Sequence, residues 1–276
     1  MSTIRALSAC LFYLVTSVGV FAQSVAPIDT LVRAIGLPDL IEIMRQEGMT
    51  YGVSLEDELF SGQGGARWAA TVADIYDLQG MQNTVRDRMD SDLAATNLAD
   101  LTNFFLSDRG KRIVQLELSA RQAMLDKDVE QAARDRAKDV LAKDDERAEL
   151  LRDFIGTGDM IENNVVGAMN SNFAFYEGLA QNSRFAPQLS TDQILADVWG
   201  QEPEIRKETS EWLFGYLAMA YQPLSDADLQ AYVDFFNTQE GRALNQAIFN
   251  AFDELFVSIS RDLGSAAALR LEGEEL

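Results

Sequence analysis

The sequence predicts an all-α protein, and three observations support this prediction. Apolar residues recur every three or four positions along most of the chain, which is the spacing of one helix face. Runs in which Val, Ile or Thr alternate with polar residues, as in a half-buried strand, are almost absent. The 276 residues include only five prolines, so few positions force a helix to stop.

The first 22 residues have the pattern of a secretory signal peptide. Arg5 precedes an apolar run over residues 6–20, and Ala22 ends a short sequence suited to cleavage. We expect cleavage after Ala22 and a periplasmic or secreted mature chain with no transmembrane segment. An uncleaved anchor is the alternative, because the apolar stretch, about 17 residues when it is counted through Ala22, reaches the lower limit for a membrane helix.

Turn residues mark the first helices of the mature chain. Pro27 begins a short helix that ends at Gly36, and Pro38 begins the next helix at its first position. This second helix is expected to end near Gly48.

A capping box is expected beyond the end of this second helix, because Ser54 and Asp57 stand three positions apart before the apolar pair at residues 59–60. Residues 61–65 contain three glycines and are expected to form a loop. Helix is expected again over residues 66–93, weakened at Gly80.

Thr96 or Asn97 can cap the following helix, and Ser107 can cap the one after it. Residues 111–155 contain neither Gly nor Pro, so one very long helix, or two helices with a mild break, is expected there. Within this stretch 17 of the 28 residues from 126 to 153 are charged, which is typical of a solvated helix face. The charged run also marks a boundary between the two halves of the chain.

The second half of the chain repeats the first. Matches occur at an offset of 120 residues early in each half, as in Asp39 and Asp159, and at 131 residues later, as in Trp68 and Trp199. About 11 extra residues are placed within residues 173–193. We therefore expect two tandem helical repeats of about 120–130 residues, packed together or joined through a long charged helix. The predicted units are a signal peptide (residues 1–22), a first repeat (23–146), a second repeat (147–265) and an acidic tail that frays (266–276).

The best-matched segment reads FFLSDRGK in the first half and FFNTQEGR in the second. Its positions are Phe104, Phe105, Ser107, Gly110 and Lys111, and Phe235, Phe236, Thr238, Gly241 and Arg242. The aromatic pair is expected to anchor one helix by burial, and the hydroxyl to cap the next. Glycine is a poor helix former, so we expect close approach of the preceding helix to require it. Neither basic residue has such an explanation, since a cation near a helix N-terminus opposes the helix dipole.

These segments resemble the exported bacterial domain-of-unknown-function family numbered twenty fifty-nine. The resemblance is carried by LLRDFIGTGDMIE and LSDADLQAYVDFFNTQEGRAL in the second half and, less closely, by residues 93–114. Asp108 and Gln239 stand where that family often has Pro. The resemblance implies an all-α fold and export from a Gram-negative bacterium. It implies no activity and no functional residue.

Composition excludes several classes of site. The only cysteine, Cys10, lies in the signal peptide, and the chain has no histidine. Thiol and imidazole catalysis, disulfides and Cys/His zinc sites are therefore excluded from the mature chain, and no cofactor or metal is expected. The formal net charge of −21 argues against nucleic acid as a partner.

Aromatic residues are concentrated in the second half, with 16 in residues 147–276 against six in residues 23–146. They suggest a better-filled core or a groove for a ligand. The groove candidates are Trp212, Tyr216, Phe249, Phe252 and Phe256.

The function expected is therefore a non-catalytic binding or adaptor role, with a protein partner or a small apolar ligand. The alternative is a carboxylate-dependent enzyme acting on cell-wall glycan, with Glu162, Glu177 and Glu240 as candidates. A third interpretation, cation binding, has little support, because the acidic pairs near residues 126 and 226 lack the spacing of a calcium loop.

Overall fold

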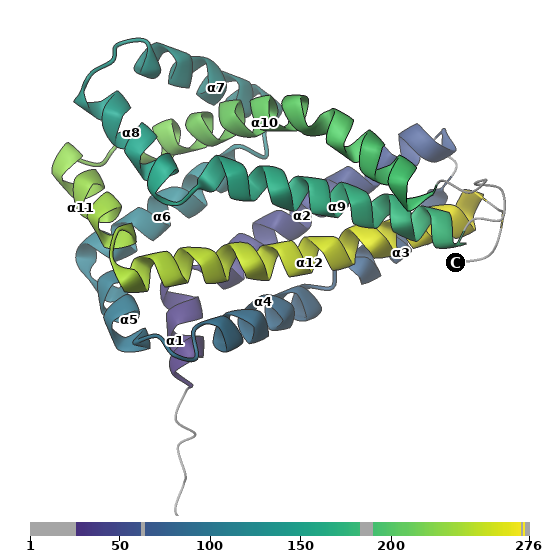
Figure 1. The fold of residues 1–276 in the computed structure, drawn as a ribbon, viewed down its shortest axis with the longest axis horizontal. Helices are drawn as coiled ribbons and strands as arrows, with labels where there is room; N and C mark the ends of the chain where they lie inside the picture. The colour runs from purple at the N-terminus through teal and green to yellow at the C-terminus, as the bar shows by residue number, and fades with distance from the viewer. Residues whose placement is uncertain (1–25, 62–63, 183–189, 272, 274–276) are drawn as a thin grey trace, which may run out of the picture.

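The computed structural model describes residues 26–61, 64–182, 190–271 and 273, and its regular structure in these ranges is entirely α-helical (Figure 1). The predicted all-α class is confirmed. The predicted signal peptide lies outside the described residues. The helices are α1 (Pro27–Ala34), α2 (Leu37–Phe60), α3 (Gly65–Ile75), α4 (Leu78–Asp92), α5 (Leu98–Leu106), α6 (Asp108–Ala123), α7 (Lys127–Leu141), α8 (Glu146–Thr157), α9 (Met160–Asn182), α10 (Thr191–Tyr221), α11 (Asp226–Phe236) and α12 (Gln239–Leu271).

The turn between α1 and α2 forms as the sequence predicts. Pro27 lies in the first turn of α1, and Gly36 adopts a left-handed φ of +71° between the two helices. Only glycine takes this conformation without strain. Ile28 and Leu31 fix α1 to the core, with 1% and 0% of their surfaces exposed.

The predicted end of the second helix near Gly48 is wrong, because α2 continues to Phe60. A side chain at Gly48 would collide with the ring of Tyr76, and one at Gly52 would lie 2.6 Å from Val72. These glycines serve close packing rather than helix termination. The capping box predicted at Ser54 is also wrong, since Ser54 lies inside α2 and its hydroxyl donates to the carbonyl of Thr50.

The long helix predicted over residues 66–93 is two helices. The break comes at Tyr76 and Asp77, and the Asp77 carboxylate accepts a 2.7 Å hydrogen bond from the backbone N–H of Gly80. Asp77 is an N-cap in the middle of an apolar stripe, so periodicity alone did not reveal it.

The stretch predicted as one or two long helices consists of α6, α7 and the greater part of α8. Asp126 and Asp145 cap α7 and α8 by accepting backbone N–H groups with their carboxylates. An acidic N-cap can begin a new helix where the sequence has neither glycine nor proline, and here both caps were hidden among other charges. The two halves are therefore not joined by a long charged helix.

Residues 266–271 are helix rather than the start of the fraying tail predicted for residues 266–276, and most of the remaining residues of that tail lie outside the described ranges. α12 continues to Leu271, and Ala267 and Ala268 are fully buried. A side chain at Gly264 would collide with the carbonyl oxygen of Phe175, and one at Gly178 with that of Arg261. The small residues let α9 and α12 cross at close range.

The helices of the two halves pack in matched pairs. α1 packs on α5 as α8 packs on α11, and α2 packs on α4 and α6 as α9 packs on α10 and α12. Across the halves, α4 packs on α12 and α10 packs on α6, and Figure 1 shows α9 lying between α10 and α12.

Buried apolar side chains from both halves join in one core, which includes Leu31, Leu101, Leu151 and Leu229. No helix in the described ranges has the length and apolar character that a membrane crossing requires.

Candidate functional site

An open hollow of about 340 Å³ lies among α2, α9 and α12. Three half-buried phenylalanines of α12 line it, and Met44 of α2 lines it too. The volume falls at the lower end of the range for small-molecule sites. Its lining residues are Met44, Asn163, Asn164, Gly167, Ala168, Ser171, Ile248, Phe249, Phe252, Asp253 and Phe256.

The hollow forms because α2 and α9 are not a closely packed pair in the described part of the chain. Each helix packs instead on its own neighbours, α4 and α6 for α2, and α10 and α12 for α9. The α9 residues at the hollow include the small Gly167, Ala168 and Ser171. A side chain at Gly167 would meet only Asp253, at 3.7 Å, so there is room beside α9.

The wall of the hollow is aromatic and its edge is polar. The rings of Phe252 and Phe256 stack with their centroids 6.1 Å apart. At the edge, the Asn164 amide donates to the carbonyl of Met160 at 2.7 Å, and Asp253 accepts from Asn170 at 2.9 Å. Such a surface suits an apolar ligand with few polar groups.

A second hollow of about 350 Å³ adjoins the first and shares Met44, Asn164 and Phe256 with it. Its other lining residues are Glu47, Gly48, Tyr51, Tyr76 and Arg121. The first hollow is therefore mainly apolar and belongs mostly to the second half of the chain, whereas the second is polar and belongs mostly to the first half.

Tyr76 is held in the second hollow by two residues of α2. Its ring lies against Gly48, where any side chain would displace it, and its carbonyl accepts a 3.0 Å hydrogen bond from Arg45. Burial, with smaller contributions from Tyr51 and Glu47, raises the pKa of the Tyr76 phenol above its ordinary value. Partial burial also raises the pKa of Tyr51, which is 51% exposed, and both phenols keep their protons at neutral pH, as an ordinary phenol does.

Arg121, near the end of α6, forms the cationic side of the second hollow. Its Nη2 lies 2.5 Å from a carboxylate oxygen of Glu47, and its guanidinium carbon lies 4.6 Å from the ring centroid of Trp212 on α10. Its Nε is buried and has no hydrogen-bond acceptor, and no other buried side-chain nitrogen or oxygen in the described ranges is left in this way.

The structure divides the predicted aromatic groove into two sets. Phe249, Phe252 and Phe256 line the first hollow, but Trp212 and Tyr216 lie elsewhere, with their rings stacked at 5.1 Å. The Tyr216 hydroxyl donates to the backbone carbonyl of Glu117 at 3.2 Å. The signal that could have separated the sets is their position on two different helices.

The repeated motif forms the same turn in both halves. Ser107 accepts from the N–H of Gly110 at 3.1 Å, and Thr238 accepts from that of Gly241 at 3.0 Å. A side chain on Gly110 would collide with the carbonyl oxygen of Phe104, and the same geometry recurs in the second motif. This is the close approach that the sequence predicts.

The other motif residues also lie away from the candidate site. Phe105 and Phe236 are buried, with 2% and 7% exposed. Lys111 is exposed at the surface, and Arg242 donates to the carbonyl of Asn237. None of the ten motif residues lines the two hollows.

A glutamate within a tyrosine cluster was missed by sequence reasoning. The Glu117 carboxylate on α6 accepts a 2.6 Å hydrogen bond from the Tyr221 hydroxyl, and Tyr232 also favours its charged form. Burial raises the pKa of Glu117 to about 7, although the two tyrosines act in the opposite direction. Glu117 lines neither hollow, so its altered acidity does not by itself mark a catalytic cleft.

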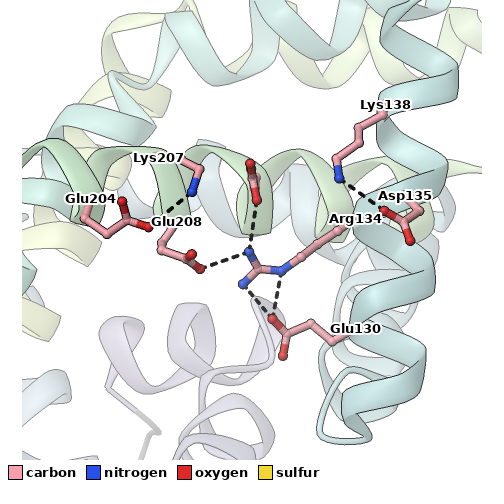
Figure 2. Close-up of polar contacts among 8 residues, drawn as sticks. Glu130, Arg134, Asp135, Lys138, Glu204, Lys207 and Glu208 are labelled. Carbon is pink, nitrogen blue, oxygen red and sulfur yellow. Dashed lines mark hydrogen bonds and ion pairs between the residues drawn. The ribbon is translucent and has the colours of Figure 1, made fainter.

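Charged side chains join α7 to α10 (Figure 2). Arg134 contacts Glu130 at 2.7 Å on its own helix and Glu208 at 3.2 Å on α10. The backbone of α7 comes close there, because a side chain at Gly215 would lie 3.1 Å from the nitrogen of Arg134. The charged stretch of the sequence is therefore partly a helix–helix contact.

The candidate carboxylates of the enzyme hypothesis are dispersed. Glu162 pairs with Arg206 at 2.8 Å and Glu177 with Arg261 at 3.6 Å, whereas Glu240 lies in the first turn of α12.

The acidic pairs of the cation hypothesis have other partners. Asp126 caps α7, Asp226 pairs with Arg147 at 2.8 Å, and Asp228 pairs with Arg109 at 2.8 Å. These carboxylates are used in capping and in ion pairs.

Comparison of the chain with protein-family models, with curated proteins and with solved structures finds no match. The resemblance noted for the two motif segments stays an expectation from the sequence.

Proposed function

We propose that this protein binds a small, largely apolar molecule in the two joined hollows between α2 and α9. The observation that carries the proposal is the wall of Phe249, Phe252 and Phe256, three half-buried rings that border an open hollow. Covering such rings with a ligand contributes about 25 cal/mol for each Å² of apolar surface removed from water.

The position of the hollows supports the same function. The first half of the chain supplies Met44 and Tyr76, and the second half supplies Asn164 and the phenylalanines. A bound molecule would therefore contact both halves. Sites at the junction of two structural units are common for small ligands.

A third hollow, between α7 and α10, has a weaker claim. Its volume is about 410 Å³, but it lacks aromatic residues, and Asp126, Asp128 and Arg136 form part of its lining. It is therefore useful as a control site rather than as a second candidate.

Two expectations from the sequence accompany this proposal. We propose that the mature chain begins after Ala22 and acts outside the cytoplasm. We also propose that its halves derive from one duplicated unit, and the matched helix pairs support this second idea. A ligand site where two such copies face each other would then be a product of the duplication.

Binding can be tested with N-phenyl-1-naphthylamine, a neutral probe whose fluorescence rises in apolar surroundings. We expect saturable binding to the native protein. Ala168→Phe places a ring in the first hollow and should abolish binding. The matched control Ala132→Phe fills the hollow between α7 and α10 instead and should leave binding unchanged. Absence of saturable binding, or equal binding by the two variants, would contradict the proposal.

A further inference from the structure

We infer that the ligand is a single-chain amphiphile with a terminal carboxylate, its tail along the phenylalanine wall and its head toward Arg121. This inference rests on the proposed function and adds the chemistry of the ligand to it.

The division of the site into an apolar and a polar hollow indicates an amphiphile. Phe249 and Phe252 line only the first hollow, whereas Tyr51, Tyr76 and Arg121 line only the second. Met44, Asn164 and Phe256 border both, so one elongated molecule can extend from one hollow into the other. Their volumes, about 340 and 350 Å³, suit a small ligand.

The polar hollow offers hydrogen-bond donors. Neither phenol of Tyr51 and Tyr76 makes a hydrogen bond within the described ranges, and the raised pKa of each keeps it protonated. With the guanidinium of Arg121, these groups can donate several hydrogen bonds to a single acceptor group. A carboxylate, with two oxygens and a negative charge, matches donors of this kind better than a hydroxyl does.

Arg121 has unused capacity for such a group. One side of its guanidinium engages Glu47, while Nε has no acceptor and is shielded from solvent. An unsatisfied buried donor is unfavourable. A carboxylate entering from the hollow can satisfy it when the side chain turns from Glu47 toward the ligand.

Glu47 is the acceptor with which the ligand would compete. The protein as a whole is strongly acidic, and this opposes the approach of an anion. That field is screened beyond about 10 Å at moderate salt, so contacts at Arg121 decide the affinity. Removing the charge of Glu47 should therefore strengthen binding of the carboxylate specifically.

The test compares two molecules with the same tail, dodecanoate and dodecan-1-ol, as competitors of N-phenyl-1-naphthylamine. The measurement is made at about pH 8, where the fatty acid is ionised. On the wild-type protein we expect dodecanoate to bind about tenfold more tightly than the alcohol. Arg121→Met should remove this preference and leave the alcohol unaffected, and Tyr76→Phe should reduce it.

Glu47→Gln is the second variant, and it keeps the test decisive if Arg121→Met fails to fold. It should increase the affinity for dodecanoate several-fold and leave the affinity for dodecan-1-ol unchanged. Equal affinities for acid and alcohol, or a preference that survives Arg121→Met, would overturn the inference while leaving apolar binding intact. Failure of the naphthylamine probe to bind wild-type protein would instead reject the proposed function and the inference with it.

Discussion

The rings of Phe104 and Phe235 stack with their centroids 4.0 Å apart and their planes inclined by 16°. The two residues hold the first position of the repeated motif in the two halves of the chain. The two motifs are therefore in direct contact. The stacked rings also connect the glycine turn at Gly110 with the one at Gly241. Tyr232 extends the stack, 5.9 Å from Phe104.

The stack predicts energetic coupling between the motifs. Phe104→Ala and Phe235→Ala should each lower the free energy of unfolding by roughly 2–3 kcal/mol. The double variant should lose about 1 kcal/mol less than the sum of the single losses, since the ring–ring contact is removed only once. Urea unfolding of the four proteins measures this. Strictly additive losses would show that the two motifs are independent.

The motif glycines predict a contrast between alanine substitutions. A Cβ at Gly110 would lie 2.6 Å from the Cα of Phe105, and one at Gly241 would lie 2.8 Å from the Cα of Phe236. Because these obstacles are backbone atoms, Gly110→Ala and Gly241→Ala should each destabilise by roughly 1–3 kcal/mol. Gly200→Ala is the matched control: that helical glycine is exposed with open space around it, so alanine should stabilise by up to about 1 kcal/mol. Melting temperatures that move in the same direction in all three variants would contradict this explanation.

The two tryptophans at matched positions predict a second contrast. Trp68 is 1% exposed and its Nε1 donates to the carbonyl of Gly52 at 2.8 Å, whereas Trp199 is 65% exposed on α10. Trp68→Phe should cost roughly 1–3 kcal/mol, through a lost hydrogen bond and lost packing. Trp199→Phe should change the free energy of unfolding by less than about 0.5 kcal/mol. Similar losses in denaturant unfolding would mean that Trp199 is buried in solution.

The two tryptophans also show which features of the structure could be predicted from the sequence. Helical periodicity predicted the fold class. The motif predicted the caps at Ser107 and Thr238, and it predicted that the preceding helix lies close to both motif glycines. Trp68 and Trp199 occupy matched positions in the sequence, but one side chain is buried and the other is exposed. Trp68 is buried and donates to the backbone carbonyl of Gly52, whereas Trp199 is exposed on α10, and that difference comes from tertiary packing.

The candidate site was only partly predictable for a related reason. Phe249, Phe252 and Phe256 were found because they share one face of one helix. Arg121 and Tyr76 were not, because they reach the hollows only through the packing of helices far apart in the chain. Gly48 also led to a wrong end for α2, because it permits a close contact with Tyr76 rather than ending the helix.

The tyrosine cluster around Glu117 predicts a particular pH dependence of stability. The pKa of Glu117 in the folded protein is about 7, above the ordinary carboxyl value of 4.5. Between these pH values the folded protein holds a proton that the unfolded chain has released, so the free energy of unfolding falls as the pH rises. The shift corresponds to at most about 3 kcal/mol, lost in full once the pH exceeds 7.

Glu117→Gln isolates this contribution, because glutamine stays neutral at every pH and can still accept from Tyr221. Between about pH 5 and pH 8, wild-type protein should lose up to about 3 kcal/mol more stability than the variant. Glu149→Gln, at an exposed position of α8, should follow the wild type and so controls for the general change in charge. Urea unfolding at both pH values provides the comparison. Equal losses in wild type and Glu117→Gln would mean that the carboxylate is ionised in the folded protein at pH 5, and that the tyrosine hydroxyls stabilise its charge more than burial opposes it.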